Sequence, residues 1–220
     1  DVRSQDSRRY LIGLIAALYL AFSVSETTNL RVIELFLRWV QSGFSNSLPP
    51  KADLMVPFFK TISYPLGVFG FIALTYFVIV GASNAVNLTD GLDGLAAGSS
   101  IYAFIFMTVV AFWAFRHESV YEINHALDLA VIAAAMVGGI TGFLWWNAPP
   151  AQIFMGDTGA LAIGAGLATL ALTLNVQLLL PIVGALFVFE TLSVIVQVGS
   201  FRMFGRRVFR MAPVHHHFEL

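Results

Sequence analysis

Long apolar tracts alternate with short polar segments along this chain. A membrane-spanning helix needs about 20 predominantly apolar residues, and residues 64–83 and 95–115 reach that length without a charged side chain. Residues 126–146 do so with a single acid, Asp128, near one end. Because only helices and closed barrels satisfy backbone polar groups in lipid, and these tracts lack the alternation of barrel strands, the pattern predicts an all-α, polytopic transmembrane helix bundle.

The tract 158–198 carries one formal charge, Glu190, and is too long for a single crossing. Asn175 and the downstream Pro181 favour a break, so we predict two spans there. A shorter apolar run near the N-terminus follows two arginines and is interpreted as a further span. About six spans are therefore predicted, near residues 10–24, 64–83, 95–115, 126–146, 159–174 and 178–198.

The segment 29–41 has a different pattern. Its charged side chains recur at helical spacing, at Arg31, Glu34 and Arg38, and apolar side chains lie away from them. This pattern predicts an amphipathic helix in the membrane interface. The apolar positions of that face are Leu30, Ile33, Leu37 and Val40.

Composition agrees with one integral-membrane domain over residues 1–220. The chain is 58% hydrophobic and 11% charged, which is unlike an ordinary soluble fold and suits a multi-pass protein in a lipid bilayer. The net charge of −1 gives no preference for nucleic acid, and the absence of cysteine excludes disulfide and thiol chemistry in this sequence.

Counting spans assigns the polar segments to one side of the membrane. If residues 1–9 lie inside, so do 84–94, 147–157 and 199–220. Of the 12 Lys and Arg residues, seven then lie inside and five outside, the sign expected for cytoplasmic segments. We therefore expect these three polar clusters to share the cytoplasmic face.

The first cluster contains Asn87, Asp90 and Asp93. Two Asp-Gly dipeptides favour a tight turn with solvated carboxylates. A helical turn would instead place both acids on one face with the amide, an arrangement suited to a divalent cation, a phosphate–metal assembly or a proton relay. The sequence favours a functional role and leaves the geometry open.

The second cluster contains Phe154, Gly156 and Asp157, just before an apolar tract. Asp157 could cap the following helix by accepting backbone N–H groups. It could equally be a metal ligand in a glycine-lined phosphate pocket, because glycine lets a diphosphate approach the backbone.

The third cluster runs from Arg202 to Glu219 and contains four arginines and three consecutive histidines. A basic patch on anionic lipid is one interpretation. Zinc binding is weakly supported, because adjacent imidazoles rarely converge on one ion. A segment that binds an anionic substrate fits best. Glu190, inside a predicted span, could be functional or make an interhelical hydrogen bond, and the structural role is slightly favoured.

These motifs resemble the phospho-N-acetylmuramoyl-pentapeptide transferases, the MraY translocases, which form a branch of the polyprenyl-phosphate N-acetylhexosamine-1-phosphate transferase superfamily. The resemblance covers nearly the whole chain. Its Asp motifs are shared across the superfamily, whereas the Pro213–Glu219 sequence is more specific to the muramoyl-pentapeptide branch. The segments that carry it are Asn84–Ala96, Phe154–Gly164, Glu190–Gly199 and Met211–Leu220.

The resemblance implies a Mg²⁺-dependent enzyme of the bacterial inner membrane with a cytoplasmic active site. It would transfer phospho-MurNAc-pentapeptide from UDP-MurNAc-pentapeptide to undecaprenyl phosphate, giving lipid I and UMP in peptidoglycan synthesis. A homodimer is possible. The implied catalytic residues are Asp90, Asp93 and Asp157, with Asp157 also the metal ligand. The implied substrate-binding residues are Asn87, Phe154, Gly156, His215, His216 and His217.

The chain departs from the family in two ways. The family has ten spans, and it carries an Asp-Asp pair and a lysine upstream that have no counterpart here. We therefore expect an internal fragment that is inactive alone. The alternatives are a GlcNAc-1-phosphate transferase, an ion-coupled transporter that uses Asp128 and Glu190, and a non-catalytic membrane scaffold.

Overall fold

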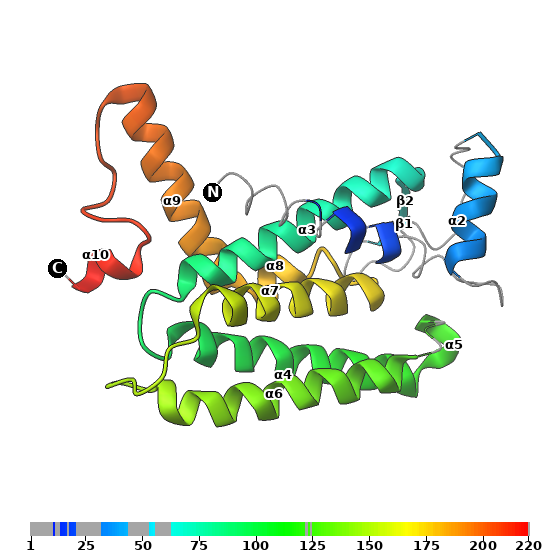
Figure 1. Ribbon diagram of the computed structural model, residues 1–220, viewed down its shortest axis with the longest axis horizontal. Helices are drawn as coiled ribbons and strands as arrows, with labels where there is room; N and C mark the ends of the chain where they lie inside the picture. The colour runs from blue at the N-terminus through cyan, green and yellow to red at the C-terminus, as the bar shows by residue number, and fades with distance from the viewer. Residues whose placement is uncertain are drawn as a thin grey trace. The chain divides into compact units, whose positions relative to one another are not determined.

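The computed structural model describes residues 11, 14–16, 18–20, 32–43, 53–55, 63–121, 123 and 125–219. Helices make up nearly all of its regular structure (Figure 1). Within the described residues, four helices are long and apolar enough to cross a membrane: α3 (Gly67–Thr89), α4 (Leu95–Arg116), α6 (Ala126–Asn147) and α9 (Ala185–Phe204). The prediction of a polytopic helical bundle is therefore confirmed.

The chain divides into two compact units, residues 1–81 with 171–179, and residues 82–170 with 180–220. The boundary passes through α3 and α7, so each of these helices contributes residues to both units. Each unit is described by itself. The prediction of a single membrane domain is not tested by this division.

The first unit contains α2 (Val32–Gln41), the antiparallel strands β1 (Asp53–Met55) and β2 (Ser63–Pro65), and the first part of α3. Leu35 and Trp39 of α2 are buried with Val68. Leu37 and Val40, expected on the face that enters the membrane interface, are exposed. The helix thus carries a second apolar stripe, formed by Leu35 and Trp39, which lie one helical turn apart and pack within the unit.

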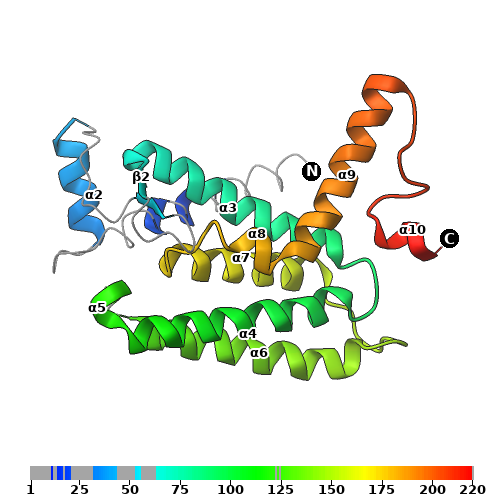
Figure 2. The same cartoon turned by 180° about the vertical axis from the view of Figure 1, so that it is seen from behind.

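The second unit contains the end of α3, α4, α6 and most of α7 (Gly156–Thr173). It also contains α5 (Glu118–Tyr121), α8 (Leu180–Val183), α9 and α10 (His215–Glu219). Both views show α4 and α6 side by side (Figures 1 and 2). Small side chains allow this close packing, since the buried residues of α4 and α6 include Ala96, Ala97, Ala103, Ala111, Ala114, Ala126, Ala130 and Ala133.

Some helix bounds differ from the predicted spans. The helix expected near 159–174 is α7, whose 18 residues extend about 27 Å at 1.5 Å per residue, somewhat less than the apolar thickness of a bilayer. The last span begins later and ends later than 178–198, because Pro181 belongs to the separate one-turn helix α8 and α9 continues to the left-handed Gly205. The predicted span 10–24 lies largely outside the described residues.

Candidate active site

A close crossing between α7 and the end of α3 brings the first two polar clusters together. A Cβ added to Gly164 would lie 2.5 Å from the carbonyl oxygen of Ala82 and 2.5 Å from the Cα of Ser83. Only a glycine allows this approach without moving backbone. From the crossing, α3 runs on to Asn87 and α7 runs back to Asp157, and Asn87 Nδ2 donates a hydrogen bond to Asp157 Oδ1 over 3.2 Å.

The aspartates of the first cluster lie in a turn rather than on a helix face. Helix α3 ends at Thr89, and residues 90–94 form turns that lead to Gly94, whose φ of 77° is left-handed. The helical arrangement considered for Asp90 and Asp93 is therefore wrong, because the two Asp-Gly dipeptides break the helix. Asp93 Oδ2 instead accepts a hydrogen bond from the backbone N–H of Ala151 over 3.1 Å.

One buried amide connects this turn with the second cluster. Asn147, the last residue of α6, is only 3% exposed. Its Oδ1 accepts from the backbone N–H of Gly94 over 3.0 Å, and its Nδ2 donates to the carbonyl of Ile153 over 2.9 Å. The two loops that precede α4 and α7 are therefore held by a single side chain.

The second cluster lies at the start of α7. Gly156 has a left-handed φ of 64°, which gives a backbone reason for glycine there. Asp157 is exposed within the first turn of α7, where the helix dipole favours its negative charge. Phe154 is 77% exposed on the preceding loop, so its ring is available to a planar partner.

The electrostatics of this region suit a divalent cation. Burial, and then the negative charge of Asp157, raise the pKa of Asp90 above its usual range. A cation bound between the two carboxylates would relieve that repulsion, and carboxylate and amide oxygens are ligands that Mg²⁺ accepts. Among the described residues no three His, Asp or Glu side chains converge to hold a metal. Mg²⁺ fits such a set, because it is commonly held by one or two carboxylates together with substrate phosphates and water.

The chain after α9 turns back along that helix and reaches α10 (Figure 2). We call residues 205–214 the return segment. Gln197 binds it at two residues: Oε1 accepts from the N–H groups of Val208 and Phe209 over 3.0 and 2.9 Å, and Nε2 donates to the Phe209 carbonyl over 3.0 Å. Ser200 Oγ donates to the carbonyl of Arg206 over 2.9 Å. The α9 side chains thus provide partners for a segment without regular structure.

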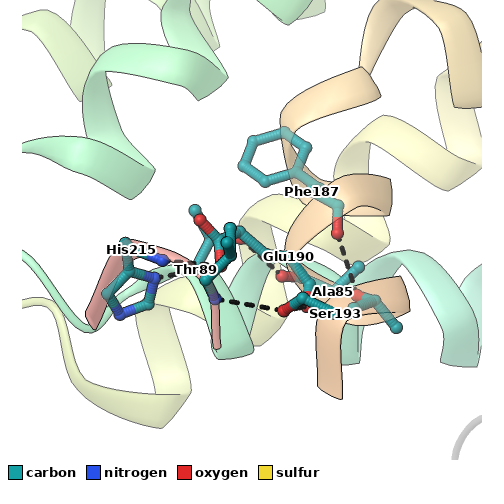
Figure 3. Close-up of polar contacts among 8 residues, drawn as sticks. Ala85, Thr89, Phe187, Glu190, Ser193 and His215 are labelled. Atoms are coloured by element: carbon teal, nitrogen blue, oxygen red, sulfur yellow. Dashed lines mark hydrogen bonds and ion pairs between the residues drawn. The ribbon is translucent and has the colours of Figure 1, made fainter. Parts of the chain in front are cut away.

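The same face of α9 binds the end of the return segment and the start of α10 (Figure 3). Ser193 Oγ accepts from the N–H of Val214 over 3.0 Å and donates to the Glu190 carbonyl over 2.6 Å. Glu190 Oε2 lies 3.1 Å from His215 Nδ1 and 3.4 Å from the backbone N of His215. Both side chains of this pair are nearly fully buried.

The three histidines have different surroundings. The His215 ring lies against Gly91, because a Cβ on Gly91 would overlap His215 Nε2 and lie 2.9 Å from Cε1. His217 Nδ1 accepts from the backbone N–H of Arg210 over 3.1 Å. The half-buried His216 ring lies 4.2 Å from that of His215. The contact at Gly91 brings the third cluster to the turn that contains the first.

The sequence interpretation missed several residues that build this region. Asn147 was not singled out, although an amide ending an apolar span just before two prolines was a usable signal. The polar face of α9 was also missed beyond Glu190. Ser193, Gln197 and Ser200 follow it at intervals of three, four and three residues, which is helical periodicity.

The fold and these contacts define a multi-pass membrane protein in which acidic, amide and imidazole side chains meet where the apolar helices end. Residues 3–175 match glycosyl transferase family 4, so the chain belongs to this family. It is the family of MraY and related polyprenyl-phosphate hexosamine-1-phosphate transferases, and the protein is accordingly a membrane-associated phosphoglycosyl transferase. The matched region includes Asn87, Asp90, Asp93 and Asp157 and ends before α9 and the histidines.

Proposed function

We propose that this protein transfers phospho-MurNAc-pentapeptide from UDP-MurNAc-pentapeptide to undecaprenyl phosphate, forming lipid I and releasing UMP. The reaction would take place at the cytoplasmic face of the bacterial plasma membrane. The observation that carries the proposal is the contact of His215 with Gly91. This contact joins two motifs: the histidine segment, which resembles the muramoyl-pentapeptide branch, and the turn with Asp90 and Asp93, which resembles the superfamily as a whole.

The chemistry explains why acids and bases are both needed. An oxygen of the acceptor phosphate attacks the sugar-bearing phosphorus of the donor, and the bond from that phosphorus to the oxygen of UMP breaks. Two anions must approach each other for this to happen. Asp157, Asp90 and Asn87 would hold Mg²⁺, which when bound offsets the phosphate charge and stabilises UMP as it leaves.

The remaining roles follow from the positions of the side chains. The hydrogen bond from Asn87 fixes one oxygen of Asp157. The exposed ring of Phe154 can stack on the uracil base. His216 and His217, with the exposed Arg210 nearby, would bind the donor's phosphates. The acceptor's polyprenyl chain would stay in the bilayer beside the apolar helices.

The full-length protein, purified in detergent, tests the proposal with undecaprenyl phosphate, Mg²⁺ and either UDP-MurNAc-pentapeptide or UDP-GlcNAc. We expect lipid I and UMP from the first donor only. A preference for UDP-GlcNAc would contradict the proposed donor and identify a GlcNAc-1-phosphate transferase.

A matched pair of variants tests the site. Asp157→Asn should lower Mg²⁺-dependent turnover by about 10²-fold or more, the loss expected when a charged group that stabilises a transition state is removed. Asp128→Asn makes the same change in an exposed acid at the start of α6, where its partner is His125, and should leave turnover unchanged. Equal turnover in both variants would exclude this site, and a selective loss with Asp128→Asn would favour the transporter alternative.

A further inference from the structure

Helix α9 has two chemically different faces. Apart from Arg202 in its last turn, its exposed large side chains are apolar and suit lipid, among them Phe189, Leu192, Ile195, Val196, Val198, Phe201 and Phe204. Four of its polar side chains fall on one stripe, at Glu190, Ser193, Gln197 and Ser200. Polar groups in a span are costly unless they are paired. Here each of the four contacts the return segment or His215.

The stripe satisfies backbone groups that have no helix or sheet to join. The N–H groups of Val208, Phe209, Val214 and His215 all point to side chains of α9. The N–H groups of Val214 and His215 are buried and need partners. With the contacts at Val208 and Phe209, they fix the path of the return segment at both ends. The path ends with His215, whose position decides where the next two histidines lie.

Glu190 makes the innermost contact of the stripe. Its Oε2 reaches both the ring and the backbone N–H of His215. On the far side of the ring, Nε2 has no hydrogen-bond partner among the described residues and faces Gly91. The imidazole is therefore held between the carboxylate of Glu190 and the Asp90–Gly91 turn.

We propose that Glu190 is a positioning residue for the transfer reaction: with Ser193 and Gln197 it holds the return segment so that His215 supports the Asp90–Gly91 turn and the next two histidines reach the donor. This inference rests on the proposed function. It extends the role of Glu190 beyond an interhelical hydrogen bond, because the contact it makes leads to the site rather than to a neighbouring span. Neither Glu190 nor Ser193 needs to touch the substrate.

The first test measures kcat and both KM values for Glu190→Leu and Glu190→Gln in the full-length protein. Leu cannot accept a hydrogen bond from the backbone N–H of His215 or pair with its ring, so we expect the donor KM to rise about tenfold, the scale of a lost hydrogen bond to a charged group. The KM of the polyprenyl acceptor should stay unchanged, because that substrate enters from the bilayer. Gln keeps the shape and one acceptor oxygen and should restore the donor KM to within about threefold of the wild type.

A pair of hydroxyl deletions on the same helix provides the control. Ser193→Ala removes the group that accepts from Val214, whereas Thr191→Ala removes a hydroxyl that donates only to the Phe187 carbonyl within α9. We expect the donor KM to rise about threefold for Ser193→Ala, the scale of one neutral hydrogen bond, and to stay unchanged for Thr191→Ala. This pair remains decisive if Glu190→Leu does not fold.

Two results would overturn the inference. One is a lower kcat with both KM values unchanged in the Glu190 and Ser193 variants, which indicates general loss of folded enzyme. The other is an equal effect of Ser193→Ala and Thr191→Ala. Failure of the proposed function gives a different result, since the wild type would then make no product from the muramoyl donor. If the wild type uses UDP-GlcNAc, the same comparison is run with that donor and still tests Glu190.

Discussion

The close crossing at Gly164 allows a prediction with a worked magnitude. An alanine Cβ there would lie 2.5 Å from backbone atoms of Ala82 and Ser83, whereas carbon contacts are comfortable at about 3.5 Å or more. The helices must separate by about 1 Å, since backbone cannot rotate away as a side chain can. Such a shift would lengthen the 3.2 Å hydrogen bond between Asn87 and Asp157 to about 4 Å, beyond hydrogen-bonding range.

Gly166→Ala is the matched control, two residues further along α7. Its Cβ would meet Phe104 Cζ at 3.6 Å, an ordinary contact. Both variants gain about 1 kcal/mol of helix propensity, but only Gly164→Ala suffers overpacking, which costs about 1–3 kcal/mol. The Tm of Gly164→Ala should therefore lie about 2–12 °C below that of Gly166→Ala.

The assay is thermal unfolding in detergent, combined with transferase turnover by the full-length protein. We expect Gly166→Ala to keep wild-type turnover with a Tm at or slightly above that of the wild type, and Gly164→Ala to lose stability and most of its turnover. Equal Tm and turnover in the two variants would refute the argument that the crossing at Gly164 sets the position of Asp157.

Two further predictions concern stability. Because the pKa of Asp90 is raised in the folded protein, its ionised form opposes folding at neutral pH, and stability is lost as pH rises through the folded pKa. Asp90→Asn should therefore raise the Tm at pH 7, have less effect on the Tm near pH 4, and abolish turnover. A lower Tm at pH 7 would contradict this. Asn147→Leu leaves the Gly94 N–H and the Ile153 carbonyl without their partner, so calorimetry should show about 1–3 kcal/mol of destabilisation for each group.

The sequence was sufficient for the elements whose signal is local. The bounds of α4 and α6 match the predicted spans to within a residue at each end, because uninterrupted apolar tracts of the right length have one interpretation in lipid. The start of α9 was placed too early. A proline could belong to the end of one helix or to a separate turn, and the sequence does not distinguish these.

The site was predictable in content and less so in geometry. Asn87 and Asp157 could be chosen from their motifs, but their hydrogen bond depends on a helix crossing that only tertiary structure defines. For Asp90 and Asp93 the sequence left a turn and a helix face both open, because a spacing of three residues fits a helix while the two glycines favour the turn that is found. Glu190 and His215 were each singled out from the sequence, but the sequence did not show that their side chains are partners.

The stripe on α9 has a consequence for how the protein is made. Residues 205–214 leave the ribosome after α9, yet they supply the partners of its polar face. An acid at the centre of a lipid-embedded helix costs about 2.5–3.5 kcal/mol until it is paired. During synthesis, α9 therefore enters the membrane before Glu190 has its partner, and this cost is removed only when His215 has been translated. Truncation just after Phe204 would leave that cost in place and should lower the efficiency with which α9 integrates into the membrane.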